Sequence, residues 1–225
     1  MKYSQFLDEL RSHAEPSFAA FQRKLIATRQ TVLGVRTPVM RKLAKKYKDR
    51  IDRLFAFPDT YFEVTFIKLA AVSLLPYEAF LSYLPQCVER MDNWAMCDCF
   101  KAKCIRKNRK EFLPVLERLF MHGGEYYERY VLVTLLTEYI DETYLSVLEN
   151  YLGRADVSEY YIHMAAAWLT AEVLGKYYET GIRWLQNGLL DAKTHNKAIQ
   201  KARESYRLTN ERKEYLLSLK IKTKA

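Results

Sequence analysis

The chain has 225 residues, 49% hydrophobic and 28% charged, which is enough apolar material for the core of one compact domain. No apolar run approaches the about 18 residues of a membrane helix, and the charged N-terminus lacks the apolar centre of a signal peptide. Four cysteines do not suggest a secreted disulfide framework. We therefore expect a single domain over residues 1–225, in a reduced cytoplasmic protein that is monomeric and has no membrane partner.

Apolar residues recur at three- and four-residue spacing along almost the whole chain, and no segment alternates like a strand. This pattern predicts an all-α protein. In chain order, we expect helices over residues 3–12, 15–29, 38–48, 59–74, 77–90, 93–107, 110–121, 126–140, 142–152, 158–175, 177–188, 193–206 and 209–219.

Four of these helices resemble one another and carry an aromatic residue at the same place. The aromatics follow at intervals of 32, 33 and 34 residues and are Phe62, Trp94, Tyr127 and Tyr161. A second helix lies between each pair and keeps the same step. Such a period predicts an α-solenoid, which stacks equivalent helices and uses one curved, concave face for binding.

Asp98 departs from this repeat. Four positions after each aromatic, the other three segments have an apolar residue, namely Phe66, Val131 and Ala165. An unpaired buried carboxylate costs several kcal/mol, so Asp98 either has a cationic partner or faces a solvated groove. Arg129, on the next repeated helix, could form a purely structural ion pair with it, and both interpretations stay open here.

The net charge of +9, from 36 basic and 27 acidic residues, favours a polyanionic partner such as nucleic acid, although basicity can also serve solubility alone. The basic residues form three clusters, each of which could also be an ordinary solvated face. Together they predict contacts with DNA phosphates. The clusters include Arg36, Arg41, Lys42, Lys45 and Lys46; Lys101 and Arg106 within the run 101–110; and Lys193, Lys197 and Lys201.

Other chemical signals are weak. Cys97, Cys99 and Cys104 lack a Cys-x-x-Cys pair, and helical spacing places only two of them on one face, so we expect no zinc site. There is no glycine-rich phosphate loop, and we expect no cofactor. His163 can line the groove but has no assigned role, and Trp184 is expected in the core.

Four motifs in order make the chain resemble the AlkD-type DNA alkylation repair family, which are glycosylases built from HEAT-like repeats. They are "LGVRTPVMRKLAKK" (33–46), "NWAMCD" with Trp94 and Asp98, "YYERYVLV" with Arg129, and "YYIHMAAAWL" with Trp168. The resemblance covers about residues 15–215. Leu25 stands where the family prototype has a cleft tyrosine, and Asn93 where it has a second tryptophan.

The resemblance implies an α-solenoid of HEAT-like repeats with a basic concave face that binds double-stranded DNA carrying alkylated bases. It further implies base excision repair, by hydrolysis of the N-glycosidic bond of cationic N3- or N7-alkylated purines without flipping of the lesion. Asp98 would then stabilise the sugar cation, Trp94 and Trp168 would contact sugar and lesion, and Arg129 would bind a nearby phosphate. We would expect such an enzyme to associate with the nucleoid.

Two other functions are compatible with the same pattern. A HEAT-like protein could bind damaged or branched DNA without cleaving it, in which case it would not need Asp98 and Trp94. A protein–protein scaffold is the third possibility, but a protein partner would call for exposed apolar anchors rather than basic clusters.

Overall fold

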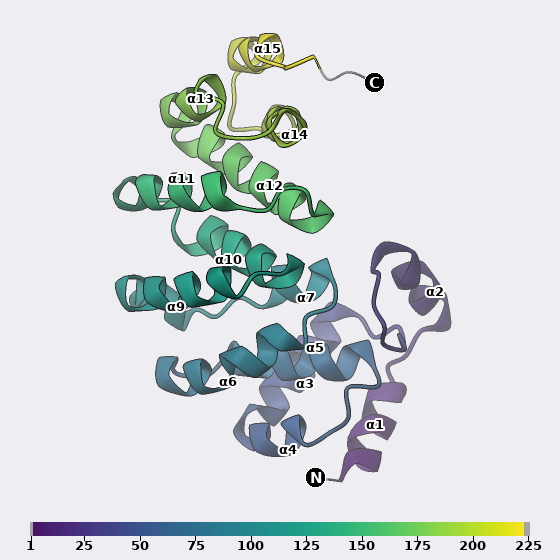
Figure 1. The fold of residues 1–225 in the computed structure, drawn as a ribbon. Helices are drawn as coiled ribbons and strands as arrows, with labels where there is room; N and C mark the ends of the chain where they lie inside the picture. Colours follow the sequence, from purple (N-terminus) through teal and green to yellow (C-terminus); the bar gives the residue numbers. More distant parts are fainter. Residues whose placement is uncertain (1, 223–225) are drawn as a thin grey trace. The chain divides into compact units, whose positions relative to one another are not determined.

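A computed structural model describes residues 2–222 of the chain. Within this range the protein is all-α, as predicted, with no β-strand and only one isolated bridge, between Thr31 and Tyr61 (Figure 1). None of the described helices is both long and apolar enough to cross a lipid bilayer. The chain divides into two compact units, which meet in the sequence between Phe112 and Leu113.

The first unit contains α1 to α8 and the start of α9, and the second contains the rest. The elements of the first unit are α1 (Tyr3–Arg11), α2 (Pro16–Leu25), α3 (Thr37–Tyr47), η1 (Lys48–Arg50), α4 (Ile51–Phe55), α5 (Phe62–Val72), α6 (Tyr77–Glu89), α7 (Trp94–Cys99) and α8 (Cys104–Lys107). They are followed by α9 (Arg109–His122), α10 (Glu125–Glu138), η2 (Glu142–Tyr144), α11 (Leu145–Arg154), α12 (Tyr160–Lys176), α13 (Tyr178–Gln186), α14 (Ala192–Arg203) and α15 (Asn210–Ser218).

Most predicted helices are present with small shifts of their ends, but two predictions were wrong. The helix expected over 15–29 ends at Leu25, where Ile26 turns to an extended conformation. The helix expected over 93–107 is broken, because Phe100 leaves the helix at ψ 75°. Its ring is buried against Phe80, with the ring centroids 5.8 Å apart. The basic run 101–110 therefore begins in this break and not on α7. The short helix α4 was not predicted.

Helix α5 is the centre of the first unit, and all of its residues are buried, including Glu63 and Lys68. It packs against α3, α4, α6 and α7. A helix that is apolar around its whole circumference is typical of a buried position. Its two charged side chains must then find partners inside the protein, since an isolated buried charge is costly.

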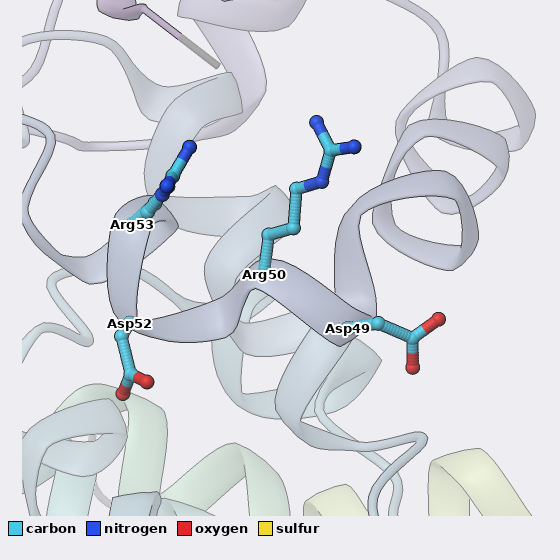
Figure 2. A pocket seen from close by; sticks show the side chains of 4 residues that line it. All are labelled: Asp49, Arg50, Asp52 and Arg53. Carbon is cyan, nitrogen blue, oxygen red and sulfur yellow. The ribbon is translucent and has the colours of Figure 1, made fainter.

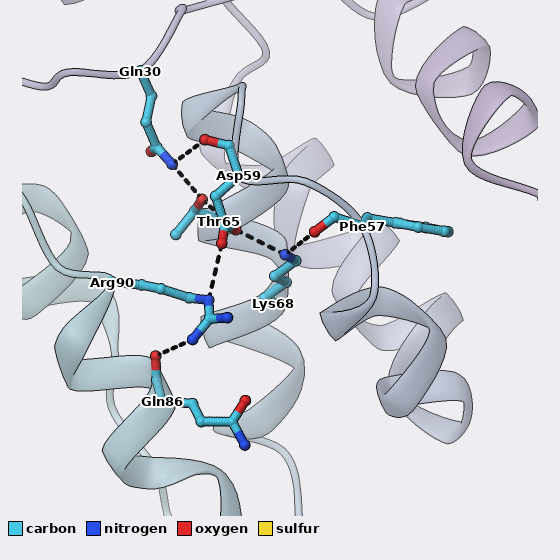
Figure 3. Close-up of polar contacts among 7 residues, drawn as sticks. All are labelled: Gln30, Phe57, Asp59, Thr65, Lys68, Gln86 and Arg90. Atoms are coloured by element: carbon cyan, nitrogen blue, oxygen red, sulfur yellow. Dashed lines mark hydrogen bonds and ion pairs between the residues drawn. The ribbon is translucent and has the colours of Figure 1, made fainter.

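The ammonium group of Lys68 lies in a network of polar groups (Figure 3). It donates to the Phe57 carbonyl at 2.6 Å and to the Asp59 carboxylate at 2.7 Å. Arg90 donates to the second oxygen of Asp59 at 3.0 Å. Burial raises the pKa of Asp59, but Lys68, Thr65 and Arg90 together hold it below its ordinary value. The ionised Asp59 therefore stabilises the folded protein at pH values above the pKa that Asp59 has in the unfolded chain. This contribution is lost as the pH falls through its lower pKa in the folded protein.

Glu63 binds the backbone that precedes α3. Its carboxylate accepts N–H groups from Leu33, Gly34 and Val35, with the shortest distance, 2.7 Å, to Gly34. Gly34 has a positive φ of 86°, and a Cβ there would lie 2.4 Å from the Glu15 carbonyl oxygen. Only glycine fits such a position without strain. The start of the motif "LGVRTPVM" is thus a loop wrapped around a buried carboxylate.

In the second unit, α12 packs against α10 and α14 and also contacts α13. Trp184 of α13 is fully buried, which confirms its expected place in the core. Apolar side chains from α12 to α15 form one cluster, which consists of Ala171, Leu174, Ile182, Leu185, Ile199, Ala202, Leu208 and Leu216. The succession α10, α12 and α14 fits the predicted helical repeat.

Replacing Lys68 with methionine keeps most of the side-chain volume but removes the ammonium group. The Phe57 carbonyl then loses its donor and Asp59 loses its closest cation. We expect the free energy of unfolding to fall by about 2–3 kcal/mol, measured by urea denaturation. Lys42→Met, on an exposed position of α3, is the matched control and should change it by less than about 0.5 kcal/mol. Equal effects of the two substitutions would contradict this role of Lys68.

Candidate functional site

Helix α7 of the first unit carries Trp94 and Asp98 and is only six residues long. Asn93 begins it, and its side-chain oxygen accepts the N–H of Met96 at 3.2 Å. Its side-chain amide donates to Asp92 at 2.6 Å, and the residue is fully buried. Asn93 is therefore an N-cap, a role that asparagine fills well and tryptophan does not.

Trp94 is half-buried and is tethered to the end of α2. Its indole N–H donates to the carbonyl of Leu25 at 2.9 Å, while the Leu25 side chain is 51% exposed. Asp92 holds the segment that follows α2, since its carboxylate accepts hydrogen bonds from the Thr28 hydroxyl at 2.7 Å and from the N–H of Arg29 at 2.9 Å. These bonds fix the orientation of the indole relative to the segment after α2.

Asp98 is half-buried near the end of α7, next to Cys99. Burial raises the pKa of the Cys99 thiol, and the Asp98 charge raises it further. The positive charges of Arg41 and Lys101 act in the opposite direction and lower it. Of the predicted site residues, Arg41 of α3 and Lys101 thus influence the segment that carries Asp98 and Cys99 in the first unit.

The remaining basic residues predicted to contact DNA in the first unit lie at the surface. Lys42, Lys45 and Arg106 are exposed. Arg36 is also exposed, but it makes a two-pronged ion pair with Glu15, with both N–O distances 2.8 Å. This ion pair occupies two of the five N–H donors of Arg36, so a phosphate would have to bind the other donors or displace the carboxylate.

A hollow of about 540 Å³ lies at η1 and α4. Two aspartates and two arginines line it, and their side chains point in different directions (Figure 2). They are Asp49, Arg50, Asp52 and Arg53. Because the opposite charges balance one another, this hollow has no preference for a polyanion.

Arg129 and Trp168 belong to the second unit. Arg129 is buried on α10, and its guanidinium donates to the Tyr161 carbonyl at 2.8 Å and lies 5.6 Å from the centroid of the Tyr161 ring. Glu125 accepts the N–H of Tyr161 at 2.8 Å. The start of α10 therefore holds the start of α12. Trp168 is half-buried further along α12. A direct pairing of Arg129 with Asp98 stays a prediction.

The lysines predicted on α14 line or flank a second hollow, of about 580 Å³, in the second unit. Lys193 is exposed, and Lys197 and Lys201 are half-buried. Lys193 and Lys197 line the hollow, together with groups for which the sequence predicted no role. These groups include Tyr160, His163, Asn196 and Lys220. Spacing along one helix could not reveal Lys220, because it follows α15 and reaches the hollow only through the fold.

None of the residues described by the structure form a group of three or more His, Cys, Asp or Glu side chains that could hold a metal ion. The four cysteines are free thiols, two buried and two half-buried.

A comparison with protein families gives one result of wide coverage. The model of a family described as "DNA alkylation repair enzyme" matches residues 6–207. No curated protein matches the chain.

The tether of the segment after α2 can be tested directly. Asp92→Ala removes the acceptor for Thr28 and Arg29, so the amide of Arg29 should exchange its hydrogen about tenfold faster or more. The amides of Leu33 and Gly34 are bound to Glu63 instead and should be unaffected. Hydrogen–deuterium exchange with mass spectrometry measures both segments in one sample. Equal acceleration of both would mean that the substitution destabilises the whole unit and that Asp92 has no local role.

Proposed function

The chain belongs to the family of DNA alkylation repair enzymes, and on that premise we propose that it is a DNA glycosylase. Its substrates would be purines alkylated at N3 or N7 in duplex DNA, and its reaction hydrolysis of their N-glycosidic bond. The observation that carries this proposal is Asp98, a half-buried carboxylate on the same short helix as the tethered Trp94.

The chemistry needs one carboxylate and little else. A purine alkylated at N3 or N7 is cationic, so it leaves as a neutral base and requires no strong acid. Positive charge develops on the sugar instead, as in other glycoside hydrolyses. A carboxylate at about 4 Å stabilises that charge by roughly 4 kcal/mol at an intermediate dielectric. The same carboxylate can orient the attacking water. We assign both roles to Asp98.

The other predicted site residues would bind the substrate. Trp94 and Trp168 are each half-buried, so part of each indole can contact sugar or lesion. A cation over an indole face contributes about 0.5–2 kcal/mol, depending on desolvation. Arg129 would bind a phosphate near the lesion, and the exposed Lys42, Lys45, Lys101 and Arg106 would bind phosphates further away. No cofactor enters this mechanism.

One observation favours a second candidate function, the binding of damaged or branched DNA without cleavage. Two positions of the family cleft differ here. Asn93 is a buried helix cap, and Leu25 presents an aliphatic side chain where the prototype has tyrosine. A protein that only binds DNA does not need these aromatic groups. Incubation with methylated duplex DNA decides between the two functions, because only the glycosylase releases free 7-methylguanine and 3-methyladenine.

Asp98→Asn keeps the shape of the side chain and removes its charge. If Asp98 stabilises the sugar cation, base release should fall about a hundredfold or more, with duplex affinity and thermal stability unchanged. The matched control is Asp49→Asn, at an exposed position of η1, which should leave base release intact. If Asp98 is only an ion-pair partner, the variant should instead unfold more easily and lose activity in proportion.

The expected lesion choice rests on Asp98 as the single carboxylate that the helical repeat provides. Asp98 is the one carboxylate at the repeated groove position, since its equivalents are Phe66, Val131 and Ala165. The protein should therefore release N3- and N7-alkylated purines, including ones with bulky N7 groups, but not uracil, hypoxanthine or ethenoadenine. A panel of these lesions in one duplex sequence measures the selectivity. Efficient release of uracil would require a general acid and would overturn this mechanism.

A further inference from the structure

The basic hollow of the second unit is built from three separate segments. Tyr160 and His163 come from α12, Lys193, Asn196 and Lys197 from α14, and Lys220 from the chain after α15. Among the residues that the structure describes, three lysines line it and no carboxylate does. Such a concentration of ammonium groups around one concavity attracts an anion, and a phosphate is the anion that the family's DNA substrate supplies.

Lys220 is held in position from both sides. His195 bonds the carbonyl of Leu219 through Nε2 at 2.9 Å. Asn196 binds the other neighbour twice, since its amide donates to the Ile221 carbonyl at 2.8 Å and its oxygen accepts the Ile221 N–H at 3.0 Å. The backbone on each side of Lys220 is therefore fixed to α14. An exposed lysine outside a helix normally has no such support. Lys220 also lies beyond the residues matched by the family model.

His163 is the buried polar group of this hollow, and its orientation is set by a short chain of hydrogen bonds. Its Nδ1 lies 2.8 Å from the Thr194 hydroxyl, and the N–H of Thr194 donates to Asp191 at 3.0 Å. Burial raises the pKa of Asp191. The side chain of Thr194 and the backbone N–H groups of Thr194 and Lys193 lower it by more, so the pKa lies below its ordinary value. The Thr194 hydroxyl thus occupies Nδ1 of His163, which leaves Nε2 as the ring nitrogen that can bind an anion.

The burial of His163 and the charges around it disfavour its protonated form. Burial and the positive charges of Lys193 and Lys197 lower its pKa, and Asp191 opposes them only in part. On α10, which also packs against α12, the cationic group is Arg129, and its guanidinium donates to the Tyr161 carbonyl. A bound anion would reverse the balance, because it neutralises the two lysines and offers an acceptor to a protonated Nε2.

We propose that this hollow binds a backbone phosphate of duplex DNA through Lys193, Lys197 and Lys220, and that His163 takes up a proton as the phosphate binds. The inference rests on the proposed function for the identity of the polymer, but not on base release. It assigns Lys220 and His163 to DNA binding and predicts that affinity rises as the pH falls from neutral through the pKa of His163 in the free protein.

The experiment measures the affinity of the full chain for undamaged duplex DNA by fluorescence anisotropy at several salt concentrations. Lys220→Gln should weaken binding about threefold to tenfold at low salt and reduce the log–log salt slope by about 0.9. Lys222→Gln is the matched control. It removes the same charge two residues further along the chain, from a side chain that does not line the hollow. It should change the affinity by less than about twofold.

A second measurement addresses His163. Its ring signals in NMR spectra should titrate at a higher pH with duplex than without, and His163→Gln should remove the gain in affinity between about pH 8 and about pH 5.5. A parallel titration with inorganic phosphate separates the two sources of the anion. A shift of His163 with inorganic phosphate but not with duplex would overturn the assignment to DNA.

The outcomes are distinguishable from those for the glycosylase. Equal effects of Lys220→Gln and Lys222→Gln on a duplex that binds would refute the phosphate site alone. If His163→Gln does not fold, the comparison of the two lysines still decides. Loss of base release in every assay, with the Lys220 effect present, would refute the glycosylase and leave this site standing.

Discussion

The buried charges of α5 are the constraint on which the first unit depends. Lys68 and Glu63 lie inside a helix that is covered on all sides, so each must be matched by groups from the surrounding chain. Lys68 holds the loop before α5 through Phe57 and Asp59, and Glu63 holds the loop before α3 through Leu33 to Val35. Burial of α5 supplies much of the hydrophobic stabilisation, and its two charges decide how the neighbouring loops run. A carboxylate or ammonium group without these partners would be too costly to bury.

The candidate site lies on a short helix whose neighbouring loops are also held by side chains that bind backbone groups. Asn93 begins α7 and Phe100 ends it by turning into the core. Asp92 and Trp94 then fasten the segment after α2. The result is a carboxylate, Asp98, that remains half-exposed beside a fixed indole. Catalytic and binding groups on such rigid supports keep their geometry without needing the substrate to order them.

The second unit uses the same kind of bond for a different purpose. Glu125 and Arg129 at the start of α10 bind the backbone of Tyr161, so one helix holds the start of the next. Asn196 and His195 of α14 do this for the chain after α15, which gives Lys220 its place. The N–H of Tyr161 at the start of α12 and the backbone groups that follow α15 have no partner within a helix, and side chains of α10 and α14 bind them. Lysines from distant parts of the sequence, Lys193, Lys197 and Lys220, are thereby brought to one hollow.

The helical class, most helix ends to within a few residues and the unusual carboxylate can all be read from the sequence. Helical periodicity is a local property, and Asp98 stands out because three equivalent positions are apolar. The spacing of Trp94 and Asp98 on one helix was also readable, since four residues make about one turn. Tertiary contacts were needed to show that α7 ends at Cys99, that Asn93 is a cap and that Lys220 lies in the same hollow as Lys193. Each of these depends on contacts between residues far apart in the chain, whose energies no local pattern contains.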